Sequence, residues 1–136
     1  MNLVLADRSD KKCVKRFYKA NNYSANFMGN DHCYLIKVEN KIIATVIISN
    51  IDDINFLHGL VVTKEYQHKG LASQLLAHSF SKHSMIYCFA DLSLNSLYTA
   101  NSYEQIDTSQ LSEALLTRFN NYQNKNSQLT AFRSSK

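Results

Sequence analysis

Apolar residues occur in short runs along the chain, and the spacing within these runs takes two forms. Residues 33–38, 42–48 and 54–62 are rich in β-branched and aromatic side chains, with short polar segments between them. Such runs are typical of β-strands, and a polar turn between two of them predicts an antiparallel hairpin. We expect polar turns at residues 39–41 and at Asp52-Asp53 to join three consecutive strands.

A helical spacing replaces this pattern after residue 70. Apolar residues then recur at helical intervals, which predicts a helix over residues 70–83. The repeating residues are Leu71, Leu75, Leu76 and Phe80. An earlier helix should reach about Asn21, with Ser9 or Asp10 as its N-cap. The apolar face of that helix comprises Cys13, Val14, Phe17 and Tyr18.

The remaining segments complete an alternating order of strands and helices. We expect strands around Leu3 and Leu5 and at residues 85–90, 103–106 and 129–133, a brief helix over residues 92–100, and a helix capped by Ser109 that reaches about Tyr122. A second helix before the strand at 33–38 is also compatible with the pattern. The order indicates an α/β (α+β) fold, with a mixed, mostly antiparallel sheet of six or seven strands flanked by helices.

Composition limits the class of protein. The 136 residues are the size of one domain, and 45% apolar residues suffice for a buried core. No run approaches the roughly 20 apolar residues of a membrane helix, and the N-terminus lacks a secretion signal, so we expect a cytoplasmic protein. Three widely spaced cysteines should be reduced and buried, and the five histidines lack ligand spacing, so no metal site is predicted.

The net charge of +4 suits an anionic ligand as well as it suits weak contact with nucleic acid. Five basic residues of the first helix, namely Lys11, Lys12, Lys15, Arg16 and Lys19, contribute strongly to it. Such a face is usually solvated, and the sequence lacks aromatic residues interleaved with lysines in a recognisable RNA motif. Nucleic acid is therefore not the expected partner.

The turn Gln67-His68-Lys69-Gly70-Leu71-Ala72 lies between an apolar strand and the leucine-faced helix. A helix N-terminus presents backbone N–H groups and about half a positive charge, which suits a pyrophosphate group. Gly70, one of only three glycines, would let the ligand approach the backbone. The alternative is that Gly70 merely ends a loop and that His68-Lys69 is a solvent-exposed turn.

This turn matches the Q/R-x-x-G-x-G/A signature of the GNAT superfamily of N-acetyltransferases, which the chain resembles. The order of elements up to about residue 107 agrees with that fold, and residues 97–104 are similar to its later L-Y-x-x-x-G-F segment. Three positions depart from the family pattern: Ser102 replaces a glycine, Tyr103 a phenylalanine and Asp91 an asparagine that contacts CoA. A carboxylate would be unfavourable beside CoA phosphates. The predicted helix over residues 109–122 is also longer than the usual connection there.

The resemblance implies that residues 1–136 form a single acetyl-CoA-binding domain, with acetyl-CoA as cosubstrate. It implies that the fourth and fifth strands splay apart and that the backbone of the fourth strand holds the pantetheine arm. The cofactor-binding residues implied are Leu60, Val61, Val62, Gln67, His68, Lys69, Gly70, Leu71, Ala72, Ser73 and Tyr98.

Two side chains are candidates for catalysis. Tyr98 stands where many family members have the tyrosine that protonates the CoA sulfur; the alternative is a core tyrosine. Residues 57–62 are similar to the L-H-A-L-A-V segment of arylalkylamine N-acetyltransferases, which implies that His58 is the base. Period two would place His58 on one strand face with Leu60 and Val62. The alternative is a strand histidine with a structural partner, and Phe56 replaces the second histidine of that group.

The resemblance implies transfer of an acetyl group to the primary amine of a small molecule or peptide, by direct attack in a ternary complex. Cys88 lies within an apolar strand, where a thiol is usually inert, so no covalent intermediate is expected. The alternative is a catalytically inactive acyl-CoA-binding regulatory module that contacts a partner protein. The late helix, with Leu111, Leu115 and Phe119 at helical spacing, could serve that contact or a homodimer.

Overall fold

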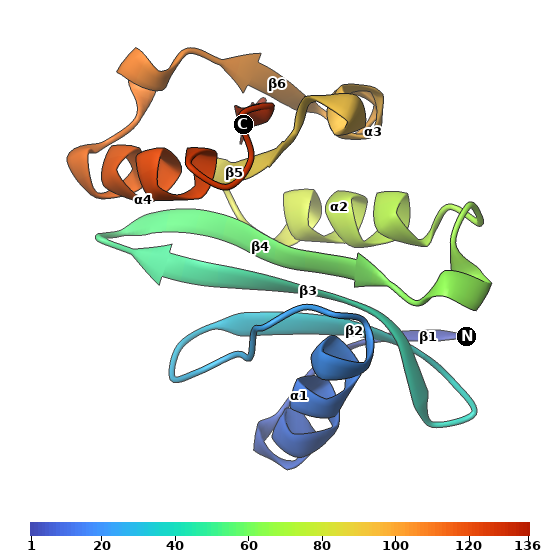
Figure 1. The fold of residues 1–136 in the computed structure, drawn as a ribbon. Helices are drawn as coiled ribbons and strands as arrows, with labels where there is room; N and C mark the ends of the chain where they lie inside the picture. Colours follow the sequence, from blue (N-terminus) through green and yellow to red (C-terminus); the bar gives the residue numbers. More distant parts are fainter. The chain divides into compact units, whose positions relative to one another are not determined.

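The elements of the chain follow the order that the apolar pattern predicts (Figure 1). A computed structural model describes all residues from Met1 to Lys136. Its strands and helices are β1 (Asn2–Leu5), α1 (Lys11–Ala20), β2 (His32–Val38), β3 (Lys41–Ile51), β4 (Ile54–Val62), α2 (Leu71–Lys82), β5 (Ile86–Asp91), α3 (Asn95–Ala100), β6 (Tyr103–Ile106), α4 (Glu113–Gln123) and β7 (Leu129–Ser134). Four short 3-10 helices accompany them: η1 (Arg8–Asp10), η2 (Lys64–Tyr66), η3 (Leu92–Leu94) and η4 (Thr108–Gln110).

The seven strands form a mixed sheet in the order β1-β2-β3-β4-β5-β7-β6, which confirms the predicted fold class. Tertiary contacts group the chain into two compact units. Unit 1 comprises Met1–Ser49 and Leu57–Leu75, and unit 2 comprises Asn50–Phe56 and Leu76–Lys136. None of the helices has the length and apolar character needed to cross a membrane.

Two tight turns connect the three central strands at the predicted positions. Glu39 and Asn40 have φ values of 51° and 64°, and Asp52 and Asp53 have φ values of 50° and 65°. Two consecutive residues with positive φ are the mark of a type I′ hairpin turn, whose twist matches that of the strands. The polar residues at both positions tolerate this left-handed conformation, so the turns fix where each strand begins.

In unit 1, α1 packs on one face of β2 and β3. Val14 and Tyr18 are completely buried, and Phe17 is 9% exposed. These helix residues form one apolar cluster with Phe27, Cys33, Leu35, Ile42 and Ile47. Cys13 is exposed, so its predicted place on the buried face is wrong. A helix turns about 100° per residue, which rotates Cys13 away from the narrow stripe that begins at Val14.

Asp10, one of the two predicted caps, occupies the N-cap position of α1, but its side chain makes no capping hydrogen bond to that helix. Asp7 is the N-cap of η1, and its carboxylate accepts a hydrogen bond from the Ser9 N–H at 2.8 Å. The Asp7 N–H in turn donates to the Asp10 carboxylate at 3.0 Å, and the two bonds together form a capping box. Ser9 and Asp10 therefore lie within the first turn, which is a 3-10 turn leading into α1. Residues 22–31 form a loop, so the second helix compatible with the sequence does not occur.

In unit 2, β5, β7 and β6 pair antiparallel and carry helices on opposite faces. Phe89 of β5 meets Phe119 of α4 at 5.1 Å between ring centroids. Cys88, the next residue along β5, is completely buried, and its pairing partner Phe132 stacks on Tyr98 of α3 at 4.9 Å. The apolar side of α4 is thus covered by its own unit.

The helix α4 begins later than the sequence predicts. Ser112, and not Ser109, is its N-cap, and the Ser112 hydroxyl accepts from the Leu115 N–H at 3.3 Å. Ser109 lies in η4. Asp107 is the N-cap of η4, and its carboxylate accepts a hydrogen bond from the Ser109 N–H at 2.8 Å. Two capping residues in series produce a short 3-10 turn before the helix, and the spacing of apolar residues does not reveal which one starts it.

One buried hydrogen bond fixes the course of β4 in unit 1. The Tyr18 hydroxyl donates to the Gly59 carbonyl at 2.7 Å, and burial raises the pKa of this phenol far above its usual range. Gly59 has a φ of +64°, and a Cβ built there would lie 2.6 Å from the Tyr18 hydroxyl. Both the backbone conformation and the close approach therefore require glycine at this position.

We expect Gly59→Ala to destabilise the protein by about 2–4 kcal/mol, because it adds left-handed strain and overpacking at once. Tyr18→Phe removes the hydroxyl that the new methyl group would meet. Chemical denaturation of both single variants and of the double variant should give a double-mutant cycle in which the double variant is more stable than additivity predicts. Strictly additive effects would contradict the close approach.

Candidate active site

The segment after β4 is tied to the end of that strand. The Thr63 N–H donates to the Ile43 carbonyl at 2.9 Å, which extends the pairing with β3. The Gln67 side-chain amide donates to the Val62 carbonyl at 3.0 Å. These bonds hold Thr63 and Gln67 against the end of the strand. The predicted phosphate-binding turn therefore starts from a fixed position.

The turn ends at the N-terminus of α2 with an open backbone. His68 and Gly70 have φ values of 64° and 82°, and no atom lies within 4 Å of a Cβ built on Gly70. The first helical hydrogen bond runs from the Gln74 N–H to the Gly70 carbonyl at 3.0 Å. The N–H groups of Leu71, Ala72 and Ser73 precede it, at the positive end of the helix dipole.

The chemistry of this turn fits an anionic group. The first turn of α2 contains no acidic residue, and Lys69 beside it is exposed. Leu71 is only 2% exposed and anchors the helix start in the core. The turn of residues 67–73 thus combines the N–H groups at the start of α2 with an exposed cation at Lys69.

Gly59 changes which side chains share a face of β4. Val61 packs against the cluster beneath α1, to which Ile47 of β3 belongs. Ser49 lies two residues beyond Ile47 on β3, and its hydroxyl bonds the His58 Nε2 at 2.7 Å. His58 therefore lies on the face of Val61, and the predicted face shared with Leu60 and Val62 is wrong. The left-handed Gly59 inserts a bulge, so the period of two is broken between His58 and Leu60.

Ser49 is a candidate functional residue that the sequence pattern did not single out. Counting along β3 and β4 from the turn at Asp52-Asp53 places His58 opposite Ile47, which makes Ser49 its diagonal neighbour on the same face. The turn type was the signal that could have revealed the pair. A hydroxyl at 2.7 Å holds the imidazole in one orientation, and either tautomer can make this bond because a hydroxyl both donates and accepts.

Tyr98 lies in the core of unit 2. Its side chain is 3% exposed, and its ring stacks on Phe132 and meets the edge of Tyr103 at a centroid distance of 5.8 Å. The ring thus has the packing role that the sequence offered as an alternative. Substitution by phenylalanine would keep this packing and remove only the hydroxyl.

The departures from the family pattern have local explanations. The Asp91 carboxylate accepts from the Ser93 N–H at 2.9 Å and from the Asn126 side chain at 3.1 Å. Hydrogen bonds from Ser93, and then from Asn126, lower the pKa of Asp91 below its usual range. Asp91 therefore caps η3 and ties it to the turn before β7. Ser102 has a φ of +70°, the conformation for which glycine is the favoured residue.

The cysteines differ in their surroundings. Burial raises the pKa of the Cys88 thiol far above its usual range, and burial likewise raises the pKa of Cys33 to about 11. Both thiols are therefore held in the protonated form, which is a poor nucleophile. No three side chains of His, Cys, Asp or Glu come together in a way that could hold a metal ion.

Comparison with known proteins supports the same fold. Escherichia coli ElaA superposes with a TM-score of 0.74 at 11% identity, covering 98% of this chain and 99% of that chain. The N-acetylglutamate synthase of Neisseria gonorrhoeae, solved with coenzyme A and N-acetyl-glutamate, gives a TM-score of 0.70 at 12% identity, covering 98% of this chain and 34% of the synthase. A variant of the spermidine N-acetyltransferase SpeG of Vibrio cholerae gives a TM-score of 0.62 at 12% identity, covering 98% and 94%.

These identities are low enough that the superpositions establish the fold alone. Comparison of the sequence with curated proteins gives no match. The sequence model of the Acetyltransferase (GNAT) family, however, matches residues 4–90, which include α1, the hairpins, the turn after β4 and α2. Since this match covers more than half of the chain, the protein belongs to the GNAT family of acetyltransferases.

Proposed function

We propose that this protein is an N-acetyltransferase that moves the acetyl group of acetyl-CoA to a primary amine by direct attack in a ternary complex. Residues 1–136 would act as a single acetyl-CoA-binding domain. The observation that carries the proposal is the geometry at the start of α2. Space is open beside Gly70, and the N–H groups of the next three residues come before the first helical hydrogen bond, which the Gln74 N–H makes to the Gly70 carbonyl. Membership of the GNAT family supports acetyl transfer as the reaction.

The turn would hold the diphosphate of the cosubstrate. The N–H groups of Leu71, Ala72 and Ser73 donate to its oxygens, and Gly70 lets them come close because it has no side chain. Gln67, His68 and Lys69 complete the turn, and the Lys69 ammonium adds a positive charge. The backbone of residues 60–62 would bind the pantetheine arm. Acetyl-CoA supplies the activated thioester when it is bound.

His58 is the proposed base. A neutral imidazole accepts a proton from the ammonium form of the acceptor, directly or through water, and so generates the nucleophilic amine. The bond from Ser49 at 2.7 Å supports this role, because a base must be held in one orientation to act efficiently. Ser49 is thus a positioning residue in the proposal.

Tyr98 is the proposed acid. A phenol is protonated at neutral pH and can donate a proton to the departing thiolate. Stacking of the ring on Phe132 would hold the hydroxyl in a fixed position. Burial also raises the pKa of both Cys33 and Cys88, which agrees with direct attack rather than transfer through a cysteine.

The reaction can be tested against the alternative of an inactive acyl-CoA-binding module. We expect acetyl-CoA to be consumed, with release of free thiol, in the presence of at least one class of amine among peptides, polyamines, aromatic amines and aminoglycosides. Mass spectrometry of the amine should show one added acetyl group. Calorimetric binding of acetyl-CoA without thiol release across the whole panel would favour the regulatory module. The buried apolar side of α4 removes one surface on which that module could bind a partner.

The cofactor turn can be tested with a matched pair of glycines. Gly70 and Gly29 both have positive φ, +82° and +49°, and both have open space where a Cβ would stand. Alanine at either position should destabilise the protein by a similar amount, about 1 kcal/mol. Only Gly70→Ala should weaken the binding of CoA, by about tenfold or more, because its methyl group would stand over the anion site. Equal CoA affinity of the two variants in calorimetry would exclude this turn.

The proposed acid and base can be tested through the pH dependence of kcat/KM. Protonated imidazole cannot accept a proton, so activity should fall as the pH becomes acidic. We expect His58→Ala to lose about 100-fold in kcat/KM and to lose this acidic limb. Tyr98→Phe keeps the stacked ring and removes only the hydroxyl, so kcat should fall by about 100-fold in a variant that thermal melting shows to be folded. A variant with unchanged rates at every pH would remove that residue from the mechanism.

A further inference from the structure

The positive charge of the chain is concentrated in one segment. Residues 8–19 contain six of the 15 lysines and arginines but only one of the 11 acidic residues. The rest of the chain therefore has nine basic and ten acidic side chains and is close to neutral. The net charge of +4 is thus a property of η1 and α1, not of the whole surface.

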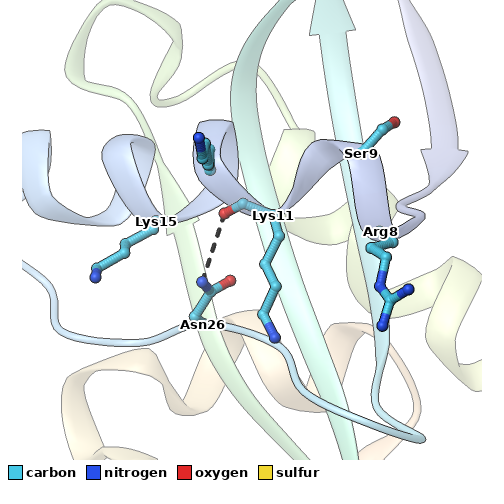
Figure 2. A pocket seen from close by; sticks show the side chains of 6 residues that line it. Arg8, Ser9, Lys11, Lys15 and Asn26 are labelled. Atoms are coloured by element: carbon cyan, nitrogen blue, oxygen red, sulfur yellow. Dashed lines mark hydrogen bonds between the residues drawn. The ribbon is translucent and has the colours of Figure 1, made fainter.

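These cations line a groove between α1 and the loop of residues 22–31. The groove consists of two adjoining hollows of about 490 and 580 Å³ that share Lys11, Lys15 and Asn26. Arg8 and Lys12 line the first hollow, and Lys19 lines the second. No carboxylate lines either one. Figure 2 shows Arg8 and Lys11 extending in the same direction, with Asn26 between Lys11 and Lys15.

The loop wall of the groove is held in place. The Asn26 side-chain amide donates to the Lys11 carbonyl at 3.4 Å, and its oxygen accepts from the Phe27 N–H at 2.9 Å. Phe27 is 8% exposed and anchors the loop in the core of unit 1. The Met28 N–H donates to the Asp31 carboxylate at 3.0 Å. A groove that exists before binding loses less entropy when a partner enters.

The acidic residues near the groove are engaged elsewhere. Asp10 pairs with Lys37 at 3.1 Å, Asp7 caps η1, and Asp31 accepts from the Met28 backbone. Neither this ion pair nor that of Arg133 with Glu104 includes a cation of the groove. The five charges of the groove are therefore not neutralised by the chain itself, and a partner with negative charge would be attracted to them.

We propose that this groove binds an extended acidic segment of a partner polypeptide. Lys11, Lys15 and Lys19 recur every four residues, so their rise along the helix is about 6 Å per step. Side chains on one face of an extended peptide recur at a similar interval, roughly 6.5 Å. Carboxylates at every second position of such a segment would thus match the three lysines one to one.

The apolar part of the groove favours a polypeptide over nucleic acid. Tyr23 is 41% exposed and Met28 is 66% exposed on the loop wall, and methionine adapts to apolar side chains of a partner. The Tyr23 ring is tilted against Tyr18 at 5.4 Å, and the Asn26 amide is engaged on both sides. The groove thus offers little for base stacking or base reading, which are the contacts that single-stranded nucleic acid requires.

Fluorescence anisotropy of a labelled peptide with glutamate at every second position over eight residues tests the proposal. A peptide with glutamine at those positions and a labelled single-stranded oligouridylate are the comparison probes. We expect the full-length protein to bind the glutamate peptide more tightly than either comparison probe. The triple variant Lys11→Gln, Lys15→Gln, Lys19→Gln should bind it about tenfold more weakly or worse.

A charge-matched variant provides the control. Lys41→Gln, Lys82→Gln and Lys125→Gln remove three exposed charges outside the groove and should leave peptide affinity within about twofold. Circular dichroism and thermal melting establish that both triple variants are folded. Equal losses in the two variants, tighter binding of the oligouridylate, or no binding of the glutamate peptide would each overturn the proposal. The outcome is independent of acetyl transfer, because it is measured without acetyl-CoA.

Discussion

The Tyr18 hydroxyl, buried beneath α1, donates to the carbonyl of Gly59 at 2.7 Å, and this bond joins the first helix to the strand that leads into the cofactor turn. It exists only because residue 59 is a glycine in the left-handed region, which removes the side chain and moves the carbonyl into reach. The same bulge turns Val61 toward α1, onto the face of β4 that also carries His58. This contact therefore links the packing of unit 1 to the course of the strand that leads to the proposed cofactor turn.

The turn proposed to bind the cofactor depends on main-chain groups far more than on side chains. Its positive end belongs to the backbone of α2, and the open space belongs to Gly70. Residues such as His68 and Lys69 can vary without removing the N–H donors, as long as the helix begins at the same position.

The first helix presents two different surfaces. Val14, Phe17 and Tyr18 form the buried stripe that holds β2 and β3, whereas the lysines occupy the side that faces the loop of residues 22–31. A row at every fourth residue follows from the helical period, but a groove requires a second wall. Phe27 and Asn26 supply that wall by fixing the loop, and this turns a basic helix face into a proposed binding surface.

The sequence by itself determined the strands, the hairpin turns, the glycine turn before α2 and membership of the GNAT family, because all of these depend on local spacing and on residues that tolerate positive φ. Tertiary structure decided the rest. The bulge at Gly59, whose carbonyl accepts from a tyrosine 41 positions earlier, separated His58 from the predicted face of Leu60 and Val62. The helix caps likewise depended on which of several nearby polar side chains bonded the backbone. The exposure of Cys13 depended on which face of α1 packs on the sheet. Periodicity predicts what a side chain would face in a regular strand or helix, whereas contacts between distant residues decide where that regularity ends.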